Sequence, residues 1–437
     1  MKKVAKYLII FWLLFFAFAI AMEATRHVTM NGPRINGTPK KIISFMSSLI
    51  SNIAKYSGIS NPIVIKNTFA LNNGFNHIEN CVDNKDYLLI SVWDNTLSQS
   101  IVKLVRIRDG KVLHKWVPEI IPLISNFNSK TENKLGKSTT RLFHPLVLRD
   151  GSLVFGAGTI SKIDLNSKIV WSSITPSSHS IEQDCDGYFW ICGFNTNTSN
   201  SKKYQIIDEA IQKISPIDGK LLFEKSVFEL LMENGYGRGI FFINPQLTAK
   251  STNFDYVHLN EVQPVLSDSK YWKKGDLFLS LRHQNLVLLY RPSTNKIIWS
   301  QNGPWLRQHD VEIIDSSRIG IFGNNVIDAK FINDDDRFID GYNNQYVYDF
   351  SKNECTTPYD TFFNSSEIRT VTEGRSKIFS NGDIFVEETN KGRILYGSKT
   401  KELWSYIEKI DNDKLSMLTW SRYITDDEFK NFSFIDK

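Results

Sequence analysis

One short pattern recurs along the chain and constrains its fold more than any other feature. A polar residue, in most cases histidine, stands shortly before a turn that opens an apolar strand. Five stretches carry this pattern with histidine, and their histidines are His77, His144, His179, His258 and His309. A sixth stretch, EGRSKIFSNGDIFVEE, has Arg375 in the place of the histidine. Because the local order is kept although the spacing varies, the sequence predicts six similar structural units.

Each unit continues from the turn into an apolar strand, a short polar turn and an aromatic residue. The aromatic residues are Trp116, Trp171, Trp299 and Trp404, with Phe223 and Tyr348 in two degenerate units. A four-stranded sheet cannot bury both faces alone, but it can when similar sheets stack radially. We therefore expect an all-β fold, a six-bladed β-propeller at residues 76–425, followed by a C-terminal tail at 426–437. In a propeller the equivalent position of every blade faces the central channel, so the recurrent histidines are expected to form a ring.

The N-terminus has the features of an export signal at residues 1–22, either a signal peptide or a signal anchor. Three lysines, Lys2, Lys3 and Lys6, precede an apolar run at residues 7–22. This run of about 16 residues is short for a membrane span, which needs about 20, and long enough for the core of a signal peptide. Cleavage and retention as an inner-membrane anchor both stay open. Either way, the body is expected to be exported, in the periplasm or another extracytoplasmic space.

Residues 23–75 lack the blade pattern and are expected to form a linker with one amphipathic helix from Lys40. The formal charge of +5 includes the three N-terminal lysines, so the rest of the chain carries about +2 without any basic run. Nucleic acid is therefore not expected as a partner. Four cysteines in an oxidising compartment allow one or two disulfides, and we favour pairing of Cys185 with Cys192 across a turn.

The polar residues that suggest chemistry lie in four stretches. In VHLNEV, His258 and Asn260 are two residues apart, so on a strand they share a face and both can point into the channel. Arg282, at the end of the next apolar run, offers a planar fork of donors suited to a tetrahedral oxyanion such as sulfate or phosphate. His179 and His309 add imidazoles from two further units.

Several residues are given plainer roles. Asp310 follows His309 directly, and strand alternation would point the two side chains to opposite faces, so no dyad is expected. Nothing near His77 or His144 distinguishes a structural role from a place in the ring. Three histidines lie outside the repeated position and are interpreted as surface or packing residues, namely His27, His114 and His283.

The order of these motifs resembles a known family. The succession SHS, HLNEV, SLRHQNLV, QHDVEII with IGIFGNN, and EGRSKIFSNGDIFVEETNKGRIL is similar to that of the bacterial arylsulfate sulfotransferases that do not depend on 3'-phosphoadenylyl sulfate. The resemblance extends from about Phe143 to Trp404. It implies an exported six-bladed propeller that moves a sulfuryl group from a phenolic sulfate ester to another phenol. The partners implied are therefore a small aryl sulfate donor and a phenolic acceptor, with no metal or organic cofactor.

Carried over by motif, the resemblance assigns roles to five residues. His309 would be the transiently sulfurylated histidine. His258, Asn260 and Arg282 would contact the sulfuryl oxygens, and His179 would lie near the phenolic oxygen. The chain departs from the pattern in its short N-terminal segment and at Gly323, where members usually have an acidic residue, so oligomeric state and acceptor choice stay open.

Two other functions stay open from the residues alone. A ring of donors also suits a binding module for an anionic or glycan ligand. Three histidines, His179, His258 and His309, also suit a metal-dependent hydrolase or lyase in which they ligate a zinc-type ion.

Overall fold

The computed structural model describes residues 63–81, 83–130, 135–241, 246–247, 253–327 and 338–434, together with Trp12 and Phe18. The chain divides into two compact units, Met1–Pro62 and Ile63–Lys437. The helix predicted from Lys40, and all but two residues of the predicted export signal, lie outside the described part. None of the helices that the structure describes has the length and apolarity needed to cross a bilayer.

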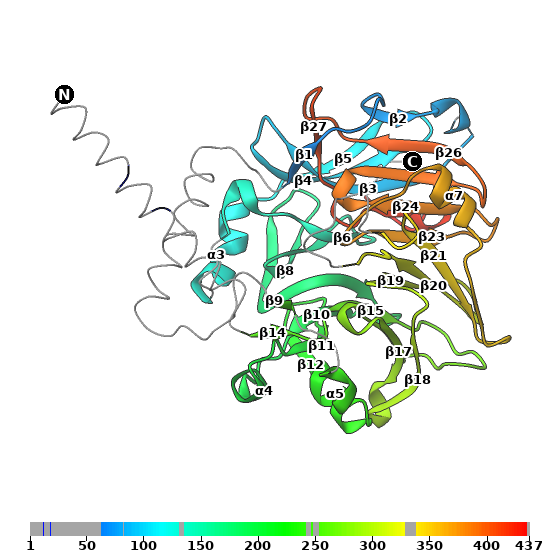
Figure 1. The fold of residues 1–437 in the computed structure, drawn as a ribbon. Helices are drawn as coiled ribbons and strands as arrows, with labels where there is room; N and C mark the ends of the chain where they lie inside the picture. The colour runs from blue at the N-terminus through cyan, green and yellow to red at the C-terminus, as the bar shows by residue number, and fades with distance from the viewer. Residues whose placement is uncertain are drawn as a thin grey trace. The chain divides into compact units, whose positions relative to one another are not determined.

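The second unit is built mainly from antiparallel β-sheets, which Figure 1 shows in the order of the colours along the chain. One sheet has the order β28 (Arg422–Ile424), β3 (Tyr87–Asp94), β4 (Gln99–Arg106), β5 (Val112–Trp116). A second has β15 (Leu259–Pro264), β16 (Leu277–Leu281), β17 (Leu286–Arg291), β18 (Lys296–Asn302). A third has β19 (His309–Ile313), β20 (Arg318–Gly323), β21 (Asn344–Asp349), β22 (Glu354–Thr356). A fourth has β23 (Arg375–Ile378), β24 (Ile384–Glu388), β25 (Arg393–Gly397), β26 (Glu402–Ile407) and, at its outer edge, β2 (Gly74–Asn76).

A fifth sheet has seven strands because one long strand serves two neighbours. Its order is β6 (Phe143–Val147), β7 (Leu153–Ala157), β8 (Thr159–Ile163), β9 (Ile169–Gln183), β10 (Phe189–Phe194), β11 (Glu209–Ile214), β12 (Leu221–Ser226). The first part of β9, to Pro176, pairs with β8, and the part from Ser177 pairs with β10. Two short ribbons pair β1 (Val64–Lys66) with β27 (Lys414–Ser416) and β13 (Gln246–Leu247) with β14 (Phe254–Asp255).

The described helices are short and lie in connections between strands. They are α3 (Ile120–Lys130), α4 (Ser199–Tyr204), α5 (Val227–Glu233), α6 (Gly237–Ile240), α7 (Asp360–Ser365) and α8 (Asp426–Phe429). Single 3-10 turns are η1 (Ile78–Cys81), η2 (Lys137–Thr139), η3 (Arg282–Gln284), η4 (Pro292–Thr294) and η6 (Thr389–Lys391).

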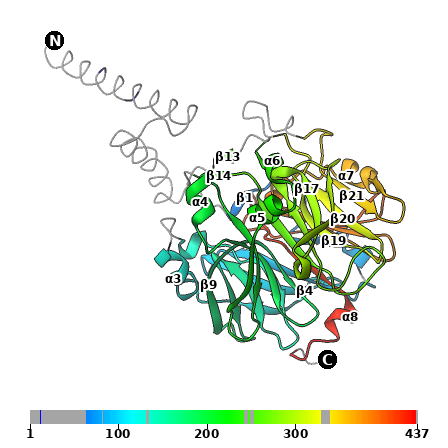
Figure 2. The same cartoon turned by 90° about the horizontal axis from the view of Figure 1, so that it is seen from below.

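The sheets form a β-propeller arrangement. The first strands of successive sheets lie beside one another, β15 next to β9 and β19, and β19 next to β23 (Figure 1), and Figure 2 shows the same sheets from below. Strands near the middle, such as β16 and β17, are buried on both faces because neighbouring sheets cover them, whereas the outermost β18 has exposed residues. Apolar clusters fill the space between neighbouring sheets, as where Phe278 and Ile321 share one core.

At three places, a buried carboxylate on one sheet connects to the first strand of the next. Glu209 on β11 accepts the backbone N–H of Leu259 at 2.6 Å, and Asp310 on β19 accepts that of Ser376 at 2.9 Å. Glu387 on β24 accepts the backbone N–H groups of Trp420, at 2.9 Å, and Ser421, just before β28. The entry of each of these first strands is therefore fixed by the sheet before it, and β28 closes the ring against β3.

The predicted disulfide is wrong, because all four cysteines are free. Cys185 is exposed in the turn between β9 and β10, whereas Cys192 is buried inside β10. From Phe189, which begins β10, to Cys192 the strand rises about 10 Å. A disulfide requires Cα atoms within about 7 Å, so these two residues lie too far apart along the hairpin.

Strands and packed side chains also occur in the segments that flank the expected propeller at residues 76–425. The compact unit begins at Ile63, β1 lies before residue 76, and β2 ends at that residue. At the other end, Phe432 and Phe434 pack against the core between β4 and β7, so the described part of the segment 426–437 is packed on the sheets.

Candidate active site

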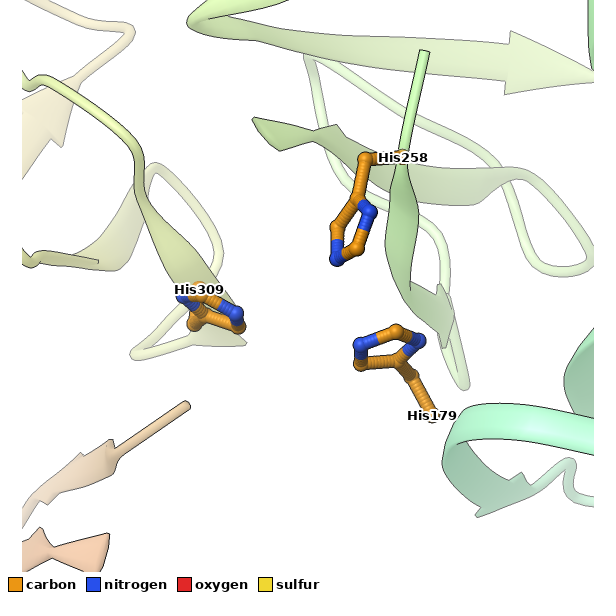
Figure 3. Close-up of side chains that lie close together, drawn as sticks. All are labelled: His179, His258 and His309. Atoms are coloured by element: carbon orange, nitrogen blue, oxygen red, sulfur yellow. The ribbon is translucent and has the colours of Figure 1, made fainter. Parts of the chain in front are cut away.

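Three imidazoles from three different first strands converge at the middle of the sheets (Figure 3). The ring centroids of His179 and His258 are 4.9 Å apart, and those of His179 and His309 are 6.3 Å apart. His179 lies in the second part of β9, His258 directly precedes β15, and His309 begins β19. The structure thus brings together these three residues of the predicted site, and their action on a substrate stays a prediction. We call them the three-histidine cluster.

The backbone at the strand entries explains the recurrent sequence position. His144, His258, Asp310, Glu373 and Trp420, each just before or at the start of a first strand, have left-handed φ values between 48° and 68°. The pairing register also shifts within the first residues of β15 and β19. A left-handed residue beside a bulge redirects side chains, so simple alternation does not describe these entries.

His309 is held in one tautomer. Its Nδ1 lies 2.6 Å from Oδ1 of Asn324. The Asn324 amide donates both of its protons elsewhere, to the carbonyl oxygens of Thr370 at 3.0 Å and Glu373 at 2.8 Å. Its oxygen must therefore accept, so Nδ1 of His309 carries the proton and Nε2 carries the lone pair. That lone pair accepts one long hydrogen bond, 3.3 Å, from the backbone N–H of Glu373.

Burial and nearby positive charge keep His309 neutral. Burial is the largest cause that lowers its pKa well below the usual value, followed by the charge of Arg282 and the neighbouring His179. Burial and His258 lower the pKa of His179 in the same way. A neutral imidazole whose Nε2 carries the lone pair is a competent nucleophile near neutral pH.

His258 belongs to a second hydrogen-bonded group centred on buried Asp255. Nδ1 of His258 lies 2.7 Å from Oδ2 of Asp255. His283 donates from Nδ1 to the backbone oxygen of Asp255 at 3.0 Å, and its Nε2 accepts from Nη1 of Arg282 at 2.9 Å. Burial alone would raise the pKa of Asp255, but its bonds to His258 and His283 hold that pKa far below its usual value. Asp255 therefore stays a carboxylate and orients His258 directly and Arg282 through His283.

Arg282 lies where the sequence placed it, at the end of β16, and it is the first residue of η3. Its backbone N–H donates to the carbonyl oxygen of His258 at 3.0 Å, and its side chain is buried. Its positive charge lowers the pKa of His179, His258 and His309 alike. This guanidinium therefore sits close to the three-histidine cluster and makes it attractive to an anion.

Asn260 also lies near the three-histidine cluster, but the strand alternation from which its position was predicted does not hold. The register shift between Leu259 and Glu261 breaks the alternation that was expected to put Asn260 on the face of His258. Asn260 is fully buried, and its amide donates to the carbonyl oxygen of Gln308 at 2.8 Å. It thus supports the peptide that carries His309, and its contact with a sulfuryl oxygen stays a prediction.

The other histidines that the structure describes differ from one another in burial and in their contacts. His77 is exposed, follows the outer-edge strand β2, and lies 3.6 Å from Glu79, so it is not part of the ring. His144 is buried and stacks on Trp420 at 3.9 Å between centroids. His114 packs against Trp116, as expected. The interpretation of His283 as a packing residue was wrong, because it connects Asp255 with Arg282.

Sequence reasoning missed Asp255 and Asn324, along with the role of His283. Asp255 stands three residues before His258, and Asn324 is the first asparagine of the motif IGIFGNN. Neither occupies the repeated position, and each acts through a hydrogen bond to a side chain on another element or turn. A polar residue buried beside a recurrent histidine is the signal that would have identified them.

The structure was compared with solved structures, and three matches illustrate the likeness. A crystal structure of a protein of unknown function from Bacteroides caccae matches with a TM-score of 0.45 and 10% identity, over 78% of this chain and 99% of that one. The Dos1 propeller matches at 0.38 and 8%, over 78% and 75%. The C-terminal WD40 domain of Sif2 matches at 0.38 and 8%, over 77% and 93%. With TM-scores under 0.5, these likenesses add nothing to the sheet order described above.

Comparison with curated proteins gave no match. The family model described as arylsulfotransferase (ASST) matches residues 145–409, which is more than half of the chain and spans the three-histidine cluster, Asp255, Arg282 and Asn324. The resemblance seen in the order of motifs is thereby confirmed. The chain belongs to the arylsulfotransferase family.

Proposed function

We propose that the protein transfers a sulfuryl group from a phenolic sulfate ester to a phenolic acceptor through a covalent intermediate on His309, without 3'-phosphoadenylyl sulfate. Family membership supports the reaction class. The single observation that supports the covalent route is the bond from His309 to Asn324, which leaves the lone pair on Nε2. That nitrogen shares the cluster with two other imidazoles, and one nitrogen of each ring points into the space between them (Figure 3).

The reaction would proceed by two displacements. In the first, Nε2 of His309 attacks sulfur, an S–N bond forms, and the S–O bond to the aryl group breaks. The departing phenolate takes a proton from an imidazolium, a role that we assign to His179 in its protonated form, which the negative charge of the bound ester favours. In the second, the acceptor hydroxyl gives its proton to His179 and attacks sulfur, and the S–N bond breaks to restore neutral His309.

Arg282 and His258 would hold the sulfuryl oxygens. The guanidinium is permanently charged and is oriented by His283, so it needs no rearrangement when charge shifts on the sulfuryl group. His258 donates from Nδ1 to Asp255, so its Nε2 becomes a second donor only when the ring is protonated. The Asp255 carboxylate and an anionic substrate both favour that protonation.

Two further parts of the proposal concern architecture and location. We infer six blades, since β9 pairs with β8 in its first part and with β10 in its second, which divides the seven-stranded sheet into two four-stranded blades sharing β9. The lysines and apolar run at residues 1–22 support export to an extracytoplasmic space.

Turnover of p-nitrophenyl sulfate with and without phenol tests the reaction class, in buffer containing a chelator. We expect p-nitrophenol release that depends on phenol and yields phenyl sulfate. Release at the same rate without phenol would indicate hydrolysis instead. Absence of turnover together with saturable binding of the ester would indicate a binding module.

A further inference from the structure

We propose that the three-histidine cluster is also a binding site for a divalent transition-metal ion such as Zn²⁺, and that the bound ion inhibits the protein by competing with the aryl sulfate. The binding half of this inference is independent of the proposed function. The inhibitory half rests on it.

The positions of the imidazoles suit such an ion. The candidate nitrogen atoms of His179, His258 and His309 all lie within 4.8 Å of one another. In a tetrahedral zinc site with Zn–N bonds of about 2.0–2.1 Å, ligand nitrogens are roughly 3.3 Å apart. The cluster therefore needs to contract by at most about 1.5 Å, a shift that side-chain torsions can supply. Three protein ligands also leave a fourth position open.

The groups behind the rings match what a metal requires. Nδ1 of His258 donates to the Asp255 carboxylate, and Nδ1 of His309 donates to the amide oxygen of Asn324. In both residues Nε2 is the nitrogen left for a metal. A carboxylate or amide oxygen behind a ligating histidine fixes its orientation and increases its basicity, which strengthens metal binding. No described carboxylate completes this group with the three histidines, so imidazole nitrogen would be the ligand type, which favours zinc-type ions over Ca²⁺ or Mg²⁺.

The charge of Arg282 opposes a cation in the same place where it favours an anion. Its backbone N–H donates to the carbonyl oxygen of His258 at 3.0 Å, and its Nη1 donates to His283, whose ring centroid lies 4.5 Å from that of His258. The same positive charge therefore weakens binding of a metal ion and strengthens binding of a sulfate ester. An ion bound to Nε2 of His309 would also occupy the lone pair that attacks sulfur, so metal occupancy and sulfuryl transfer exclude one another.

Titration of the chelator-treated protein with Co²⁺, followed by its visible absorption, and competition by Zn²⁺ measure binding without any turnover. We expect one ion per chain with the spectrum of nitrogen-ligated Co²⁺. Single substitutions His179→Asn, His258→Asn and His309→Asn should abolish that spectrum, whereas His77→Asn, at an exposed histidine, should leave it unchanged. Asp255→Asn should weaken binding about 10- to 100-fold, because it removes the oxygen behind His258.

Arg282→Gln gives the discriminating result. It should increase the affinity for Zn²⁺ while it weakens binding of p-nitrophenyl sulfate, since one charge acts on both ligands with opposite sign. In the wild-type protein Zn²⁺ should raise the KM for the ester without lowering kcat. A Co²⁺ spectrum that survives all three histidine substitutions, or affinities for both ligands that fall together in Arg282→Gln, would overturn the site. Turnover stimulated by Zn²⁺ would overturn the inhibitory role. A protein that binds Co²⁺ as predicted but transfers no sulfuryl group would refute the proposed function alone.

Discussion

Nδ1 of His309 lies 2.6 Å from the side-chain oxygen of Asn324, whose own amide protons are both donated to backbone carbonyl groups. This relationship makes the orientation of the Asn324 amide, and hence the tautomer of His309, a consequence of backbone geometry around Thr370 and Glu373. His309, on one sheet, is thereby positioned by the loop that enters the next sheet. A buried amide in this place keeps the ring neutral, whereas a carboxylate would favour the imidazolium.

The first prediction follows from that difference. Asn324→Asp should raise the pKa of His309, because a carboxylate beside Nδ1 stabilises the protonated ring, and a protonated His309 cannot attack sulfur. The acidic limb of the pH profile of kcat/KM should therefore move to higher pH, with a loss of about tenfold for each unit by which the new pKa exceeds the assay pH. The profile is measured with chelator present. Asn353→Asp, at an exposed turn, should leave it unchanged.

Arg282→Lys keeps the charge but removes the planar fork and the donor to His283. We expect kcat/KM for the aryl sulfate to fall about 100-fold, the usual cost of losing one preorganised donor to a developing charge. Arg106→Lys is the matched control, since Arg106 pairs with Asp109 at the surface. Unchanged kinetics in Arg282→Lys would exclude Arg282 from contact with the sulfuryl oxygens.

The sequence predicted the histidines of the candidate site better than it predicted the residues that hydrogen-bond to them. His179, His258 and His309 could be grouped because the same position in each repeated unit approaches the same axis. His77 could not be separated from them, because the sheet begun by β3 takes its first strand from the C-terminal segment β28, and Trp420 occupies the equivalent entry. The repeated sequence pattern does not reveal that a C-terminal strand pairs with the sheet that begins at β3.

Asp255, His283 and Asn324 were missed for a different reason. Each acts through a hydrogen bond that joins turns or strand ends, and such bonds leave no periodic trace in the sequence. The bulges at Leu259 and His309 likewise were not recognised in the sequence. Strand alternation therefore did not correctly explain the position of Asn260. For Asp310 the expected result was right, since its carboxylate bonds to Ser376 and not to His309.

Closure of the ring gives a prediction about stability. Glu387 is fully buried and accepts two backbone N–H groups at the entry to β28. Glu387→Gln replaces one acceptor oxygen by a donor, so we expect the free energy of unfolding to fall by about 1.5–3 kcal/mol. Urea denaturation measures it. Glu354→Gln, at an exposed position on β22, should change the free energy by less than about 0.5 kcal/mol. Equal stability of the two variants would contradict the role of Glu387 in closure.

Glu312 gives a pH dependence. Burial, with a smaller contribution from Asp310, raises its pKa from 4.5 to about 8, although Lys377 acts in the opposite direction. Because the folded pKa is the higher one, the stabilising contribution of this group is complete below about pH 4.5 and is lost as the pH rises toward 8. Glu312→Gln stays neutral and should therefore be more stable than the wild type near pH 9 but not near pH 4. Urea midpoints at the two pH values test this, and Glu119→Gln, at an exposed position, should show no such difference.

The central claim, a sulfurylated His309, is tested most directly by the mass of the intact protein after addition of p-nitrophenyl sulfate without acceptor. We predict a gain of one SO₃ group, located by peptide mapping on the segment with Gln308, His309 and Asp310, and its loss when phenol is added. His309→Asn should abolish the label, and Asp310→Asn should retain it, because Asp310 bonds to β23. A label on His179 or His258, or an active protein that never carries a label, would contradict the account.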